Sequence, residues 1–300
     1  MPRDHLPAAI ALRLASVLLF ALMNVGIKLA EAWGAGLGEI LFWRQAGAAL
    51  LVAGVLAAGP GFGAVRTRRM GAHVGRTVLG LGAMTLTFTT LTLLPLAEAT
   101  TIGFSMPIFA TVLGALVLRE PTGWWRWGAV LAGFAGVVIV AQPGSGGGIA
   151  PLGLATGLGA ALGTGTVSIL LRTLGQTERP IATVFWFSVL SLAPLGVVYM
   201  LDLRGHDAGT WAVLVGIGLL GGAAQLAMTT SLKLGPVSSV VPMDYSALLW
   251  ATLFGWLVFG RWPAEATWLG APVIVASGLI IVWREQVRRR VETRQAVADA

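Results

Sequence analysis

Ionisable side chains within long apolar runs are the residues of this sequence best placed to do chemistry. Lys28, Glu39, Arg44 and Glu98 lie in or beside three such runs, with Glu31 close by. A cation there can meet a substrate carboxylate. Opposite charges close in sequence can instead pair and lock helices together, or reach a polar interface. The paired arrangement is favoured, and Lys28, Glu39 and Arg44 are also candidate coupling or gating charges.

Asp244 is the aspartate that lies clearly within an apolar run, in the stretch 242–246. Burial disfavours the charged carboxylate, so Asp244 can exchange a proton near neutral pH or bind a substrate ammonium group. Alternatively, Pro242 breaks the helix and the carboxylate caps the segment that follows. Both hypotheses stay open, and Asp244 joins the candidate coupling or gating charges.

A second set of side chains has the character of a cavity wall: aromatic rings, methionines and a few hydrogen-bonding groups. The candidate substrate-binding residues are Met84, Phe88, Thr89, Phe104, Met106, Trp186, Gln225, Met228, Tyr245 and Trp250. Such walls suit an amino acid or another small amphipathic metabolite. Threonines in helices often bond their own backbone, so Phe104, Trp186 and Tyr245 are the stronger candidates. Pro107 is expected to interrupt its helix close to Phe104.

Constellations typical of enzymes are missing from the sequence. It has no cysteine, which removes thiolate nucleophiles, disulfides and cysteine metal sites. His5, His73 and His206 are expected in connecting segments, and Asp244 has no second aspartate at its depth, which disfavours intramembrane hydrolysis or group transfer. A phosphate-binding GK[ST] loop is absent too. We predict no enzymatic activity, no cofactor and no metal.

Composition places the chain in a lipid bilayer. It has 300 residues, of which 56% are hydrophobic and 11% charged, with a mean hydropathy of +0.82. Soluble domains carry about a quarter charged residues. A bilayer core needs about 20 apolar residues per helix, and the sequence predicts ten such helices, at roughly 8–30, 38–58, 76–94, 97–118, 124–141, 151–171, 181–201, 210–232, 237–259 and 264–283.

The basic residues predict the orientation of these spans. If the N-terminus is cytoplasmic, nearly all Lys and Arg outside the spans fall in cytoplasmic segments, and only Arg204 and Arg261 fall outside the cell. This asymmetry is the positive-inside pattern, so both termini are expected in the cytoplasm. Because the net charge of +7 is spread over many connections, it does not predict nucleic-acid binding. The polar tail after Trp283 is expected to fray into water.

The second half of the chain repeats the first. The segment ATVLGALVLREP at 110–121 returns as ATLFGWLVFGRWP at 251–263, and the order of several weaker matches is kept across five spans. Because five is odd, the two repeats must be inverted in the membrane, an arrangement typical of secondary transporters. The predicted units are a first repeat at 1–146, a second at 147–284 and a basic cytoplasmic tail at 285–300.

Three stretches resemble the EamA type of the drug/metabolite transporter superfamily: MNVGIKLAE, LFWRQAGAALLV and GALVLREPTGWWRWGAVLAGFAGVVIV. The resemblance covers essentially the whole chain. It places Lys28 and Arg44 where the family commonly has a lysine and an arginine, and Glu120 at the family's Gly-Glu turn. Arg261 departs from that glutamate in the second repeat. Within the family, the sequence looks most like bacterial amino-acid and metabolite exporters, in particular the aromatic amino-acid type.

Together these features predict an all-α polytopic membrane protein of ten helices in two inverted repeats. We expect a secondary active transporter that exports amino acids and related small metabolites across the bacterial inner membrane by alternating access. The alternatives are a broad drug or organic-cation exporter and, in a different class, an intramembrane enzyme. The expected partners are small-molecule substrates and lipid, with the chain a monomer or a weak dimer.

Overall fold

The computed structural model describes residues 6–116, 123–142, 149–175, 177–234 and 240–298. The regular structure of these residues consists of helices and includes no strand, which confirms the predicted all-α class. The expected boundary between the repeats, at 146–147, lies outside the described residues, as does Glu120.

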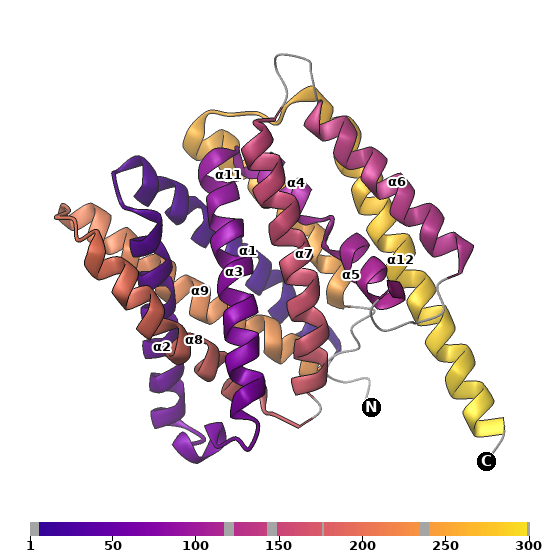
Figure 1. Cartoon of the computed structure of the whole chain (residues 1–300), viewed down its shortest axis with the longest axis horizontal. Coiled ribbons are helices and arrows are strands. Elements are labelled where there is room, and N and C mark those ends of the chain that lie inside the picture. Colours follow the sequence, from indigo (N-terminus) through magenta and orange to yellow (C-terminus); the bar gives the residue numbers. More distant parts are fainter. Residues whose placement is uncertain (1–5, 117–122, 143–148, 176, 235–239, 299–300) are drawn as a thin grey trace.

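The two halves of the chain present their helices in the same order (Figure 1). The first half comprises α1 (Leu6–Ala32), α2 (Leu37–Ala58), the short helix η2 (Phe62–Val65), α3 (Met70–Leu93), α4 (Leu96–Gly103), α5 (Met106–Leu116) and α6 (Trp124–Ala141). The second comprises α7 (Pro151–Leu174), α8 (Pro180–Leu201), α9 (Ala208–Leu234), η3 (Val241–Ser246), α11 (Ala247–Phe259) and α12 (Glu265–Ala298). Among the described residues, eight helices are long and apolar enough to cross a membrane, with α4 and α5 counted as one.

Corresponding segments of the two halves are interrupted near their middle. In the first half, α4 ends at Gly103 and α5 begins at Met106, because Pro107 cannot donate a backbone hydrogen bond to the preceding turn. In the second half, η3 contains Pro242 and precedes α11. The predicted break near Phe104 is therefore confirmed, and an irregular segment occupies the equivalent place in the second half.

The contacts between helices follow a twofold pattern. Helix α1 packs along α9, and its counterpart α7 packs along α3. Helices α2 and α8 pack against each other, as do α6 and α12, and Figure 1 shows the latter pair at one side of the bundle. Exchanging the two halves maps these contacts onto one another, as expected for a fold of two repeats. Since each repeat has an odd number of spans, the repeats are inverted.

Glycines set the closest approaches between helices of different halves. Where α2 crosses α9, a Cβ added to Gly47 would lie 2.6 Å from the Cα of Gly218. Where α6 crosses α12, a Cβ added to Gly270 would lie 2.7 Å from the carbonyl oxygen of Gly136. No side chain fits at these crossings, and small residues are the usual means of close helix packing in membranes.

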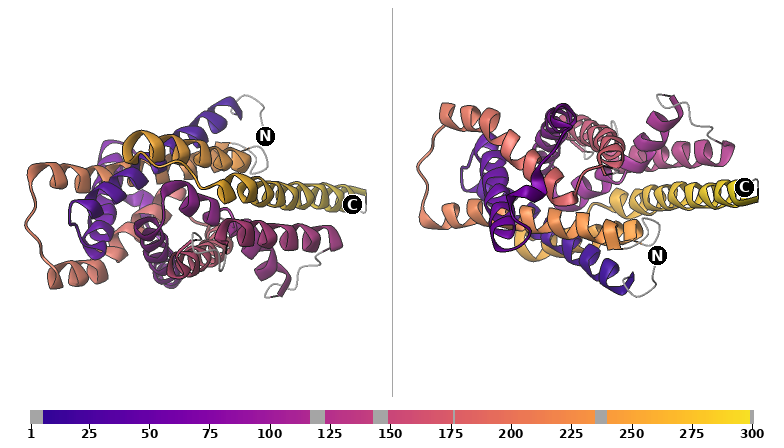
Figure 2. Two further views of the ribbon diagram at one scale, coloured as in Figure 1. Left: turned by 90° about the horizontal axis from the view of Figure 1, so that it is seen from above. Right: turned by 90° about the horizontal axis from the view of Figure 1, so that it is seen from below.

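Helix α12 differs from expectation at its C-terminal end. The polar stretch after Trp283 was predicted to fray, but α12 continues without interruption to Ala298. Figures 1 and 2 show this end projecting beyond the other helices. Its alanine, glutamate, glutamine and arginine residues are strong helix formers, which allows the helix to extend past the bundle.

Candidate substrate cavity

Both halves of the chain contribute to a cavity of about 320 Å³ in the middle of the bundle. Residues from α1, α3, α4, α5, α7, α9, η3 and α11 line it, and most of its wall is apolar. Its polar lining consists of hydroxyl groups, an amide and an ion pair: Arg13, Ser16, Asn24, Thr87, Thr90, Thr100, Thr164 and Asp244. Apolar walls with a few convergent polar groups are typical of small-molecule sites.

An ion pair between Arg13 and Asp244 closes part of this wall. The guanidinium Nε and Nη2 of Arg13 donate to the two carboxylate oxygens of Asp244, in the bidentate arrangement that gives strong, oriented charge-assisted bonds. The Arg13 side chain is 8% exposed and that of Asp244 34%, so the carboxylate is the more accessible partner. The pair joins α1 to η3 and therefore joins the two halves.

This pair changes the interpretation of Asp244. Its carboxylate bonds Arg13, and neither η3 nor α11 has a side-chain cap, so the capping hypothesis is wrong. Arg13 was not recognised as a site residue from the sequence, although an arginine inside an apolar run was a usable signal. Its partner lies 231 residues away, which no local pattern reveals.

The structure places some of the predicted wall residues in this cavity. Phe104, Met106 and Met228 line it. Tyr245 stands behind Phe104, with ring centroids 5.1 Å apart in an edge-to-face arrangement. The Tyr245 hydroxyl oxygen lies 2.0 Å from where a Cβ of Gly278 would be, so Tyr245 supports the wall and does not form part of it.

The face of α3 that meets the cavity is not the one expected. Thr87, Thr90 and Leu91, at i, i+3 and i+4, line the cavity. Phe88 is buried in the apolar core, and the hydroxyl of Thr89 bonds its own backbone, at the carbonyl of residue 85. Met84 also packs against this core. Five of the eight residues at 85–92 are threonines, so spacing alone did not select the correct stripe.

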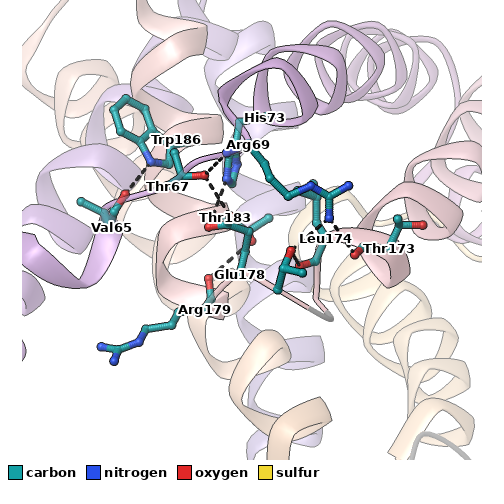
Figure 3. Close-up of polar contacts among 11 residues, drawn as sticks. Val65, Thr67, Arg69, His73, Thr173, Leu174, Glu178, Arg179, Thr183 and Trp186 are labelled. Atoms are coloured by element: carbon teal, nitrogen blue, oxygen red, sulfur yellow. Dashed lines mark hydrogen bonds and ion pairs between the residues drawn. The ribbon is translucent and has the colours of Figure 1, made fainter.

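Three further candidates lie away from the cavity. Trp250 stacks on Phe254, with ring centroids 5.9 Å apart. Gln225 accepts a hydrogen bond of 2.9 Å from Arg44 Nη2, between α9 and α2. Trp186 donates to the carbonyl of Val65 over 2.8 Å and holds the end of η2 against α8, as Figure 3 shows.

The predicted charge cluster is divided: Lys28 and Glu98 line one small pocket together with Arg261, whereas Arg44 has other partners. Lys28 Nζ donates to the carbonyls of Leu91 and Leu94 at 2.6 and 2.9 Å, at the C-terminal end of α3. Glu98 accepts a bond of 2.9 Å from the backbone of Ala264, just before α12. A cation at a helix C-terminus and an anion at an N-terminus each complement the helix dipole. Within the described residues Lys28, Glu98 and Arg44 form no ion pair with one another, which corrects the predicted network.

Arg44 is held by neutral groups. It is buried between α2 and α9 and bonds the amide oxygens of Gln45 and Gln225. Nearby, the Arg76 guanidinium carbon lies 3.5 Å from the ring centroid of Phe187, a cation–π contact. The two guanidinium groups thus sit among amide and aromatic partners, outside the cavity wall.

A family of known proteins matches this chain in two segments, one in each half. The model of the EamA-like transporter family matches residues 7–142 and 151–283. A riboflavin transporter of Vibrio cholerae is 32% identical over 75% of this chain and 76% of its own length. One of Rhizobium johnstonii is 33% identical over 77% and 76%.

Two more distant proteins also match most of this chain. An S-adenosylmethionine uptake transporter of Rickettsia felis is 25% identical over 74% of this chain and 75% of its own. A solved crystal structure superposes with a TM-score of 0.64 at 20% identity, over 91% of this chain and 95% of that one. The latter likeness concerns the fold alone.

Inverted helical repeats around a cavity that both halves line are typical of multi-pass membrane transporters. The chain belongs to the EamA-like transporter family, within the drug/metabolite transporter superfamily. The predicted superfamily and transporter class are confirmed. The relatives named above carry riboflavin or S-adenosylmethionine, which are larger than the amino acids expected from the sequence.

Proposed function

We propose that this protein imports a planar heteroaromatic metabolite of the riboflavin type by alternating access around the central cavity. The cavity carries this proposal: its volume of about 320 Å³ falls at the lower end of the range for small-molecule sites. Phe104 contributes an aromatic ring to the wall, and threonine hydroxyl oxygens from α3, α4 and α7 can accept hydrogen bonds from a polar ligand. The hydroxyl protons of Thr87 and Thr90 are already donated to the backbone of α3. Two relatives above 30% identity bear the name riboflavin transporter.

The orientation belongs to the same proposal. With the N-terminus in the cytoplasm of a bacterium, the basic segments around η2 and at the end of α12 face inward, as the positive-inside pattern requires. The chain then crosses the inner membrane ten times, and the C-terminal end of α12 projects into the cytoplasm.

Amino-acid export is the second candidate, and the Arg13–Asp244 pair favours it. The pair presents a cation and an anion at the cavity wall, which match the carboxylate and ammonium groups of an amino acid. S-adenosylmethionine carries the same two groups. A zwitterion that entered the pair would exchange one set of charge-assisted bonds for another at little desolvation cost.

Counterflow into proteoliposomes tests the two candidates together. Liposomes loaded with unlabelled riboflavin are expected to take up labelled riboflavin faster than protein-free liposomes. An excess of S-adenosylmethionine, each amino acid and a panel of organic cations serves as competitor, with and without an imposed pH gradient. Competition by amino acids, with no riboflavin counterflow, would favour the second candidate and contradict the first.

Alanine at Phe104 is expected to reduce riboflavin counterflow about tenfold, because a ring on the wall of a binding site contributes more than ~1 kcal/mol. Trp250→Ala serves as the matched control, since Trp250 is an aromatic residue outside the cavity. The initial rate is measured at equal amounts of folded protein. Equal losses in the two variants would show that the cavity wall does not contact the substrate.

A further inference from the structure

Two buried histidine–carboxylate pairs lie at opposite ends of helix α8. Near its start, His73 Nε2 lies 3.6 Å from Glu178 Oε2, and beyond its end, His206 Nε2 lies 2.8 Å from Glu39 Oε2. All four side chains are at most 7% exposed. Since α8 has 22 residues, the pairs are about 33 Å apart along the helix axis, the span of a bilayer core.

The first pair belongs to a set of contacts that we name the α3 clamp: Arg69, His73 and Glu178 (Figure 3). Arg69 precedes α3, and its Nη1 donates to Thr177 Oγ1 over 3.0 Å and to the Thr173 carbonyl, in the last turn of α7, over 3.5 Å. His73 lies in the first turn of α3, fully buried, which corrects its predicted place in a connection. The clamp ties the start of α3 in one repeat to the α7–α8 connection in the other.

The second pair belongs to the α9 clamp: Arg204, His206 and Glu39. Arg204 precedes α9, and its Nη1 donates over 2.9 Å to the carbonyl of Gly34, just after α1. Arg204 also bonds the exposed carboxylate of Asp202 and lowers the pKa of that group. This clamp ties the start of α9 to the α1–α2 connection, again across the two repeats.

The inverted repeat relates the two clamps. Exchanging the halves takes α3 to α9, α7 to α1 and α8 to α2. In each clamp an arginine before the third span of one repeat bonds a backbone carbonyl at the end of the first span of the other. In each, a histidine faces a glutamate at the start of the second span. The equivalence is one of helix ends, because the residues do not align one to one.

We propose that the α3 and α9 clamps are the alternating latches of the two faces, so that opening a face requires breaking its own clamp. This inference rests on the proposed alternating-access transport. The buried histidine–glutamate contacts and the exposed arginine bonds beside them hold the helix ends of one face together. These contacts stabilise the closed form of that face and are lost when the helix ends separate. Because the repeats exchange conformations, weakening one clamp shifts the population toward the state in which the other is closed.

Hydrogen exchange without substrate tests the latches. Glu39→Leu is expected to raise exchange about tenfold at the start of α2 and the α8–α9 connection. The same variant should slow exchange at the start of α3 and the α7–α8 connection. Glu178→Leu should produce the opposite pattern. The milder Glu39→Gln and Glu178→Gln, which keep a hydrogen-bond acceptor, should give smaller shifts in the same directions and remain informative if the leucine variants misfold.

Hydrogen exchange at the face opposite to the substituted clamp distinguishes a latch from a local contact. A clamp that only pins its own loop would raise exchange locally and leave the other face unchanged, and that result, or faster exchange at both faces, overturns the proposal. Asp207→Ala is the matched control: Asp207 precedes α9, and the hydrogen bonds described for its carboxylate come from Gly209 and Thr210 of the same helix end. It should affect that turn alone. Since no substrate is present, failed riboflavin counterflow would refute the proposed substrate and leave this test intact.

Discussion

Asp244→Ala is expected to abolish transport and to lower the stability of the folded protein. The substitution leaves the Arg13 guanidinium buried at the cavity wall without its counter-charge. Breaking a fully buried pair by removing one partner costs about 3–5 kcal/mol. The loss here should be smaller, because the Asp244 side chain is 34% exposed and water in the cavity can solvate Arg13. Counterflow in proteoliposomes and the thermal unfolding midpoint in detergent measure the two effects.

Two double variants separate the role of charge from that of folding. Arg13→Gln with Asp244→Asn removes both charges, so the folded protein should recover much of its stability while transport stays low. Arg13→Asp with Asp244→Arg restores an ion pair with reversed polarity, and should recover stability as well. Normal counterflow by the neutral double variant would show that the pair holds the two halves together and does not act on the substrate.

The backbone architecture was largely predictable from the sequence. Ten spans and their inverted repeat follow from apolar length and from the matched segments of the two halves. The break before Pro107 follows from the chemistry of proline, which removes a donor and forces the chain out of the helix. The spans and the proline break depend on residues that are adjacent in the sequence, and the repeat is visible as similar segments in the same order. The sequence pattern is therefore enough to predict these features.

The site was less predictable, because it depends on helix rotation and on distant partners. On α3 the threonines are so frequent that a stripe containing Thr89 and one containing Thr87 and Thr90 fit the sequence equally well. Only packing against α7 decides which stripe faces the cavity. The partners of Lys28 are the carbonyl groups of Leu91 and Leu94. Backbone groups at a helix end leave no trace in the identity of the side chains.

The second large effect is expected at the crossing of α2 and α9. Gly218→Ala should destabilise the protein by about 3 kcal/mol, because overpacking a closed contact forces the backbone to shift. The added Cβ would lie 2.4 Å from the carbonyl oxygen of Trp43 and 2.7 Å from the Cα of Gly47. Both are backbone atoms, so relief requires α2 and α9 to separate.

The same substitution two residues earlier provides the control, with the opposite sign. No atom lies within 4 Å of a Cβ added to Gly216, and alanine is favoured over glycine within a helix by roughly 0.5–1 kcal/mol. Gly216→Ala should therefore unfold at the same temperature as the parent protein or slightly higher, and Gly218→Ala clearly lower, in detergent. If Gly218→Ala unfolded at the same temperature as Gly216→Ala, α2 and α9 could not cross as closely as described. The α9 clamp, in which Glu39 lies on α2 and His206 lies just before α9, would then lose its geometric basis.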